Sequence, residues 1–120
     1  MNTKIQSFTQ LEVWKLAHLL VIEIYKTTEL FPVKEKFGLT SQMRRSALSI
    51  TSNIAEGFGR RSKKEKIQFY YIAKGSVTEL QNQMLLSKDL EYLEKSKFEH
   101  LAATSVSIIK MLNKIISILS

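Results

Sequence analysis

Apolar residues recur every three or four positions along four stretches of the chain, the spacing that places them on one face of an α-helix. These stretches predict helices at about residues 9–30, 40–57, 62–90 and 96–119. Helices of this length with short connections are typical of antiparallel bundles, and no alternating strand pattern competes with them. The pattern therefore predicts an all-α, up-down-up-down antiparallel four-helix bundle that forms a single domain over residues 1–120.

Local signals mark where the helices begin and end. Three of the expected helices begin with a capping box, in which a Ser or Thr is followed three residues later by a Glu: residues 9–12, 62–65 and 96–99. Gly57 is placed to end the second helix in a left-handed conformation. Gly75, in the middle of the third helix, costs about 1 kcal/mol relative to Ala. We expect a neighbouring helix to approach closely at Gly75 and Ser76 in compensation.

The first expected helix is apolar around more than half of its circumference. Its two apolar stripes consist of Leu16, Leu20 and Ile24, and of Leu11, Trp14, Val21 and Tyr25. One stripe can pack in the core of the bundle. The other is open to two interpretations: it widens the core contact, or it forms an interface with a second subunit.

Positive charge is concentrated between the second and third expected helices. The chain has a net charge of +7 and a pI near 9.7, and residues 44–74 hold eight Lys or Arg against two acids. Such a balance favours an anionic partner, nucleic acid above all. The candidate nucleic-acid-binding residues are Arg44, Arg45, Arg60, Arg61, Lys63, Lys64, Lys66, Tyr71 and Lys74.

The start of the third helix is the centre of this candidate site. Its free backbone N–H groups and the four cations of residues 60–64 would together bind an anion such as a phosphate. Tyr71 could stack on an unpaired base, whereas Phe58 and Tyr70 favour core packing. The competing interpretation is a charged face that meets only water.

The chain offers few residues for catalysis or metal binding. It has no Cys, and His18 and His100 lie on different expected helices without a His or Asp at ligand spacing. Glu56 and Glu79 could form an acid pair across helices two and three, although a buried ion pair with Arg45 is the favoured interpretation. We therefore expect no enzymatic activity, no cofactor and no metal.

The sequence does not indicate secretion or a membrane partner. Residues 1–6 are polar, and Glu23 and Lys26 interrupt the richest apolar stretch. No window reaches the ~18 to 20 uncharged apolar residues of a membrane span. We expect a cytoplasmic protein.

Several separate segments, in order, resemble one known family. They are Phe8, Leu11, Val13, Trp14, Lys15 and Ala17; residues 31–32 and 37–39; residues 42–47, Ser49 and Ile50; residues 53–57, Arg60 and Ser62; and Phe69, Ala73, Gly75, Ser76, Glu79, Leu80 and Gln83. This pattern resembles the four-helix-bundle proteins encoded in 23S rRNA intervening sequences, also called S23 ribosomal proteins. The resemblance covers residues 8–92 densely and the last helix by pattern alone.

The resemblance implies a cytoplasmic bacterial protein that assembles as a ring-like homopentamer and has no established catalytic activity. The chain is also similar to the accessory protein of diversity-generating retroelements, a basic pentamer that binds nucleic acid and a reverse transcriptase. The family's basic positions correspond to Arg44, Arg45 and Arg60, whereas Arg61, Lys63 and Lys64 are additions of this sequence.

Two hypotheses of function follow. The first is a basic homo-oligomer that binds nucleic acid, with RNA favoured, through the edge between helices two and three. The second is a structural scaffold, oligomeric through its doubly apolar first helix, that recruits a protein partner without touching nucleic acid.

Overall fold

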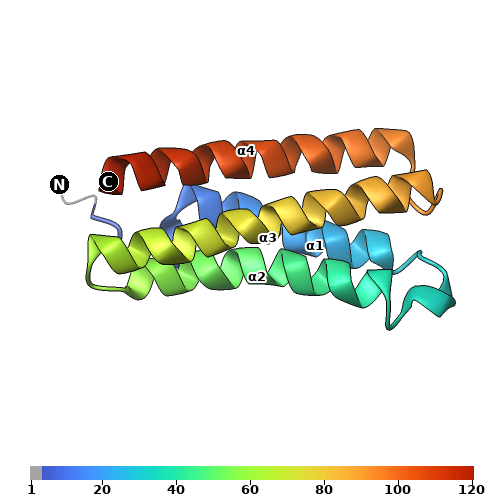
Figure 1. Cartoon of the computed structure of the whole chain (residues 1–120), viewed down its shortest axis with the longest axis horizontal. Helices are drawn as coiled ribbons and strands as arrows, with labels where there is room; N and C mark the ends of the chain where they lie inside the picture. Colours follow the sequence, from blue (N-terminus) through green and yellow to red (C-terminus); the bar gives the residue numbers. More distant parts are fainter. Residues whose placement is uncertain (1–3) are drawn as a thin grey trace.

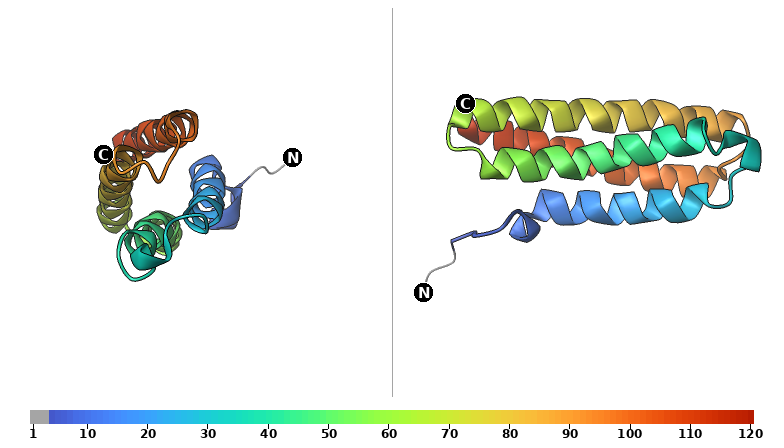
Figure 2. Two further views of the ribbon diagram at one scale, coloured as in Figure 1. Left: turned by 90° about the vertical axis from the view of Figure 1, so that its right-hand side faces the viewer. Right: turned by 90° about the horizontal axis from the view of Figure 1, so that it is seen from below.

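Four long helices make up the computed structural model, which describes residues 4–120. They are α1 (Glu12–Thr28), α2 (Leu39–Gly59), α3 (Lys63–Asp89) and α4 (Lys95–Leu119), with 3₁₀ turns η1 (Phe8–Gln10) and η2 (Val33–Glu35) before α1 and α2. Each helix lies beside its neighbours in the chain, and α1 also contacts α4 (Figures 1 and 2). The prediction of an all-α domain of four packed helices is confirmed.

The core runs along the axis of the bundle, and each helix contributes one stripe of buried residues. The fully buried members include Ala17, Leu20 and Ile24 of α1; Met43, Ala47, Ile50 and Ile54 of α2; Ala73, Val77, Leu80 and Met84 of α3; and Leu101, Ile108 and Leu112 of α4. In α1 the buried face lies between the two expected stripes, because Val13 and Ala17 are buried whereas Tyr25 is exposed. Apolar residues of α1 therefore remain at the surface.

Of the three expected capping boxes, one was correctly placed. The Ser62 hydroxyl accepts a hydrogen bond from the backbone N–H of Glu65 at 3.1 Å and caps α3. At the first helix the capping box forms between Ser7 and Gln10 instead and starts η1, so α1 begins only at Glu12 without a side-chain cap. The box at residues 96–99 was also wrong, because α4 already begins at Lys95.

The expectation about Gly57 was wrong, and the close approach expected at Gly75 and Ser76 is found at Ser76. Gly57 lies inside α2, which continues to Gly59, and no glycine in residues 4–120 has a positive φ. Gly57 is instead needed for packing, because a Cβ there would lie 2.7 Å from Cε1 of Tyr70. Gly75 is exposed, and a Cβ there would have no neighbour within 4 Å. The close approach of α2 and α3 occurs one residue later, where the hydroxyls of Ser49 and Ser76 are 2.8 Å apart.

By length and composition alone, α4 is the helix of the described chain that could cross a membrane, with a mean hydropathy of 1.4 over its most apolar window. The apolar stretch interrupted by Glu23 and Lys26, which the sequence suggests as the richest, lies in α1 instead. One face of α4, including Leu101, Ile108 and Leu112, packs fully in the bundle core. Val106 and Ile118 lie on its outer side and are exposed.

Candidate nucleic-acid interface

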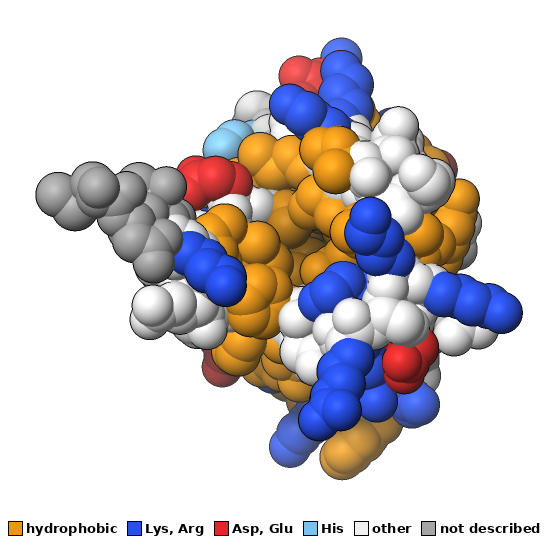
Figure 3. All heavy atoms as spheres, turned by 90° about the vertical axis from the view of Figure 1, so that its left-hand side faces the viewer, with side chains coloured by type: hydrophobic (Ala, Val, Ile, Leu, Met, Phe, Trp, Pro, Cys, Tyr) orange, Lys and Arg blue, Asp and Glu red, His pale blue; other side chains and the backbone are white. Residues whose placement is uncertain are grey.

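We call residues 60–64 the basic turn; they comprise the connection between α2 and α3 and the first two residues of α3. Arg60 has an extended backbone that ends α2, and Ser62 caps α3. Arg61, Lys63 and Lys64 are exposed, and within residues 4–120 their side chains make no hydrogen bond, ion pair or ring contact. Figure 3 shows Lys and Arg side chains projecting around this end of the bundle. The basic turn thus presents three free cations beside a helix N-terminus.

Two other candidate cations of this region are bound to the protein itself. The Arg60 guanidinium forms an ion pair with Glu56 at 2.9 Å and lies over the ring of Phe69. Lys66 Nζ donates to the backbone carbonyl of Phe58 at 2.6 Å, which satisfies one of the free carbonyls at the end of α2. Arg60 and Lys66 therefore hold the basic turn in place.

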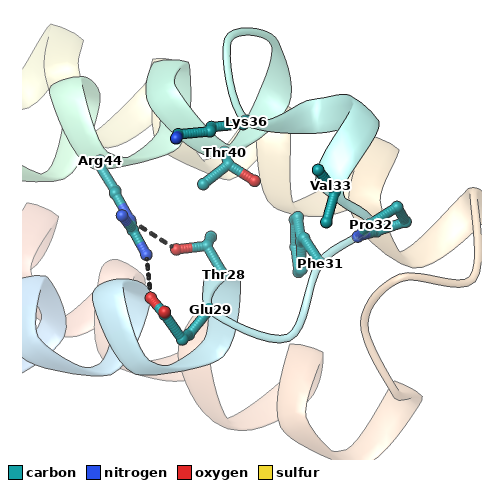
Figure 4. A pocket seen from close by; sticks show the side chains of 8 residues that line it. All are labelled: Thr28, Glu29, Phe31, Pro32, Val33, Lys36, Thr40 and Arg44. Carbon is teal, nitrogen blue, oxygen red and sulfur yellow. Dashed lines mark hydrogen bonds and ion pairs between the residues drawn. The ribbon is translucent and has the colours of Figure 1, made fainter.

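The structure does not bring Arg44 and Arg45 together with the basic turn. Arg44 lies sixteen residues before Arg60 on α2, which corresponds to about 24 Å along the helix. Its guanidinium donates to the Thr28 hydroxyl at 2.9 Å and to the Glu29 carboxylate at 3.0 Å (Figure 4). Arg44 also lies over the ring of Tyr25, 4.7 Å from its centroid. It joins α2 to the end of α1, while Arg45 is exposed.

Of the two aromatic residues expected to pack in the core, Tyr70 does so and Phe58 lies outside the core. Tyr70 is buried, and this burial raises the pKa of its phenol. Phe58 is half-buried beneath Lys66, whose Nζ lies 5.5 Å from the ring centroid. Tyr71 is 54% exposed on the outer side of α3, with Lys74 Nζ 5.5 Å from its ring centroid.

The position of Lys63 and Lys64 has an electrostatic consequence. Both lie in the first turn of α3, where the helix macrodipole and the free N–H groups already produce a positive potential. Cations there destabilise the helix, because they are repelled by the positive potential of its N-terminus. A bound anion would offset this repulsion. The two lysines are thus poorly placed for stability and well placed for anion binding.

The structure contains neither the acid pair nor the buried ion pair considered for Glu56 and Glu79. Glu56 is exposed and bound to Arg60, and both Glu79 and Arg45 are exposed. Among residues 4–120 no group of three or more His, Cys, Asp or Glu could hold a metal ion. His18 stacks on the ring of Trp14 with a centroid distance of 4.6 Å.

No sequence motif indicated the grooves of the surface. Two lie along the seam between α1 and α4 and share Glu23 and Lys26: one of about 280 Å³ and one of about 560 Å³ that reaches the α3–α4 turn. Leu19, in the first groove, is 58% exposed. A smaller pocket of about 200 Å³ lies beside Arg44 (Figure 4). The one signal in the sequence was the excess of apolar residues on the first helix.

The fold and the matched residues decide the family. A family model described as 23S rRNA-intervening sequence protein matches residues 9–114, nearly the whole chain. The chain belongs to the 23S rRNA-intervening sequence protein family. Its fold is also that of a crystal structure of an S23 ribosomal protein family member from Bacteroides thetaiotaomicron, described as a protein with unknown function. The two are 25% identical with a TM-score of 0.81, over 88% of this chain and 95% of that one.

A search of curated proteins gives no match. The family match confirms the resemblance to the 23S rRNA intervening-sequence proteins, including the last helix as far as residue 114. The basic turn lies within the matched part of the chain. The chemistry of that turn has to be argued from its own residues.

Proposed function

We propose that this protein is a non-enzymatic, cytoplasmic homo-oligomer that binds nucleic acid, with RNA favoured, through the basic turn. The observation that carries the proposal is the group of three free cations, Arg61, Lys63 and Lys64, at the N-terminus of α3. Phosphate oxygens would accept hydrogen bonds from the N–H groups of the first turn of α3 while the cations neutralise their charge.

Contacts of this kind predict a strong dependence on salt. Each phosphate neutralised contributes about −0.7 to −0.9 to the slope of log K against log salt. Three cations on one subunit therefore give a slope of about −2 to −3. In an oligomer, several copies of the basic turn would act on one nucleic acid and strengthen modest contacts by avidity.

Self-association is the second part of the proposal, and a second copy of the chain is the expected occupant of the α1–α4 groove. A second apolar surface lies on another side of the bundle, where Leu85 of α3 and Val106 of α4 are exposed and line a shallow hollow of about 200 Å³. Two different apolar surfaces that meet between neighbouring copies make a heterologous contact, which closes into a ring when the rotation allows. The family resemblance favours five subunits.

RNA binding is tested with a triple variant, Arg61→Ala, Lys63→Ala and Lys64→Ala, against wild type in fluorescence anisotropy at two salt concentrations. The variant is expected to lose at least about tenfold in affinity and most of the salt slope. The control removes Lys34, Lys36 and Lys95, three exposed lysines at the opposite end of the bundle. Equal affinity of wild type and the triple variant would rule out the basic turn as the interface.

A charge reversal separates binding from stability. Lys63→Glu and Lys64→Glu place an acid at the positive end of α3, so each is expected to stabilise the fold by a few tenths of a kcal/mol. The same changes should abolish RNA binding. Loss of binding that accompanied loss of stability would point to misfolding rather than to a missing phosphate contact.

The oligomer is tested by sedimentation velocity at micromolar concentration. Wild type is expected to have the sedimentation coefficient of a ring-like oligomer. The Leu19→Lys and Val106→Lys variants should each have that of a monomer. A monomeric wild type would remove the oligomer from the proposal.

One observation favours the alternative function, a scaffold that recruits a protein partner such as a reverse transcriptase. Leu30, Val33 and Phe37, around the connection between α1 and α2, are each 87% exposed. Exposed apolar clusters often mark protein-binding sites. The scaffold hypothesis predicts that the triple alanine variant and wild type have the same affinity for RNA, so the anisotropy experiment also decides between the two functions.

A further inference from the structure

The outer face of α3 forms a continuous exposed stripe that begins at the basic turn. Its members, spaced alternately four and three residues apart and all exposed, are Lys64, Gln68, Tyr71, Gly75, Thr78 and Asn82. The stripe extends over about 27 Å at the rise of an α-helix. None of the six is an acid, and Glu79, four residues after Gly75, lies about 40° around the helix from it at the border of the stripe.

Gly75 is the residue of this stripe that packing does not explain. A glycine in the middle of a helix is destabilising relative to alanine, and here a Cβ would have no neighbour within 4 Å. Side chains on a helix lean toward its N-terminus, so a side chain at position 75 would lie over position 71, one turn earlier. A long side chain at position 75 would therefore extend through this open space toward Tyr71.

The surroundings of Tyr71 suit a nucleobase. Its ring is 54% exposed, and Lys74 Nζ lies 5.5 Å from the ring centroid, where it can reach a phosphate next to a stacked base. Lys64 lies two helical turns away on the same stripe, about 10 Å along the axis. Stacked nucleotides advance about 3.4 Å each, so some three nucleotides would connect the two positions.

We propose that Tyr71 and Gly75 form a stacking platform for one unpaired base of a single strand that runs along α3 from the basic turn. The proposal rests on phosphate binding at that turn and adds a preference for single-stranded over double-stranded nucleic acid. The ring of Tyr71 stacks on the base, Gly75 gives the base room, and Lys74 neutralises the adjoining phosphate.

The experiment uses the full chain and an RNA oligonucleotide that contains 2-aminopurine, both as a single strand and as a duplex. Binding of wild type to the single strand should quench the 2-aminopurine fluorescence. Tyr71→Ser is expected to lose the quenching and about 5- to 100-fold in affinity for the single strand, with affinity for the duplex unchanged. Tyr71→Phe, which keeps the aromatic face, should behave as wild type.

Gly75→Leu tests the platform without touching Tyr71. Leucine favours the helix over glycine, so the variant should be at least as stable as wild type while its side chain covers the ring. We expect it to lose single-strand affinity as Tyr71→Ser does. The matched control is Asn82→Leu, two turns further along the same stripe, which should leave binding unchanged.

The outcomes separate the platform from the proposed function. If the triple alanine variant loses RNA binding while Tyr71→Ser binds the single strand as wild type does, the platform is wrong and the phosphate site stands. If wild type binds neither form of RNA, both proposals fail. If Gly75→Leu changes the sedimentation coefficient, a second copy of the chain covers this face and the platform is wrong.

Discussion

Tyr70 of α3 lies against the backbone of Gly57 on α2, so closely that a Cβ at position 57 would be 2.7 Å from Cε1 of the ring and 3.1 Å from Cβ of Phe69. The ring of Tyr70 is buried, with 4% of its surface exposed. Gly57 therefore allows two helices to approach each other next to the basic turn. The conformation of the turn does not require it, because α2 continues through Gly57 to Gly59.

Gly57→Ala is expected to destabilise the protein by about 1 to 3 kcal/mol, since the added methyl group forces Tyr70 or the helix backbone to move. Gly75→Ala is the matched control: it adds the same methyl group to an open helical site and should stabilise the protein by about 0.5 to 1 kcal/mol. Urea unfolding measures both. A Gly57→Ala variant as stable as wild type would show that the ring can give way freely.

Arg44 has a structural role that the sequence did not indicate, because it was grouped with the other basic residues of its stretch. Its Nε donates to the hydroxyl of Thr28, a residue with 2% exposure, and one terminal nitrogen donates to the carbonyl of Tyr25 at 3.2 Å. Arg44→Ala should cost about 1 to 2 kcal/mol, chiefly through these two bonds. The pair with Glu29 contributes little, because the Glu29 side chain is 77% exposed.

Arg45→Ala is the control for this prediction, because the neighbouring side chain is exposed and should change stability by less than about 0.5 kcal/mol. Both variants should keep the RNA affinity of wild type at temperatures where they are folded. A loss of affinity in either one, with the fold intact, would return that arginine to the nucleic-acid interface.

Glu91, in the turn after α3, is the non-glycine residue with a positive φ among residues 4–120, at 63°. The N–H of Tyr92 donates to the carbonyl of Ser87, and the N–H of Glu91 donates to that of Lys88, both at 2.9 Å. These are the two bonds of a Schellman motif, whose left-handed position favours glycine. Glu91→Gly should therefore stabilise the protein by about 0.5 to 1 kcal/mol.

Thermal unfolding measures this change. The control is Asp89→Gly, two residues earlier and still in α3, where the loss of helix propensity should lower the midpoint instead. A lower midpoint of thermal unfolding for Glu91→Gly than for wild type would contradict the backbone strain assigned to this position.

The spacing of apolar residues was sufficient to predict the helices. Residues such as Ala73, Val77, Leu80 and Met84 are four, three and four positions apart, and this spacing places them on one face only if the segment is an α-helix. The ends of the helices were harder to predict. Ser7 offers the same capping chemistry as Thr9 two residues earlier, and the competition between them is decided by where the chain enters the bundle. A sequence motif does not contain that information.

Contacts between helices were the part of the candidate site that sequence could not supply. The exposure of Arg61, Lys63 and Lys64 follows from their charge, but the binding of Arg44 to Thr28 depends on how α1 packs against α2. The grooves beside α1 depend in the same way on how far α1 stands from α4. In each case the chain pattern identified apolar or basic residues without showing what would face them.

Glu23 of α1 and Lys97 of α4 form an ion pair across the seam that holds the two grooves. The hydrogen bond from Lys97 lowers the pKa of Glu23, and the charge of Lys97 acts in the same direction. A carboxylate with a lowered pKa in the folded state contributes stability above its unfolded pKa, and this contribution is lost as the pH falls through the folded pKa. The pair should therefore stabilise the protein at neutral pH and not in acid.

Glu23→Gln tests this directly. Its unfolding midpoint should lie below that of wild type at pH 7, and the difference should shrink as the pH falls below the ordinary Glu value of 4.5. The effect is modest because the Glu23 side chain is 39% exposed. Glu99→Gln, an exposed carboxylate of α4 with no ion pair in the described chain, serves as the control. A difference that stayed constant or grew in acid would show that the pair does not carry the pH dependence assigned to it.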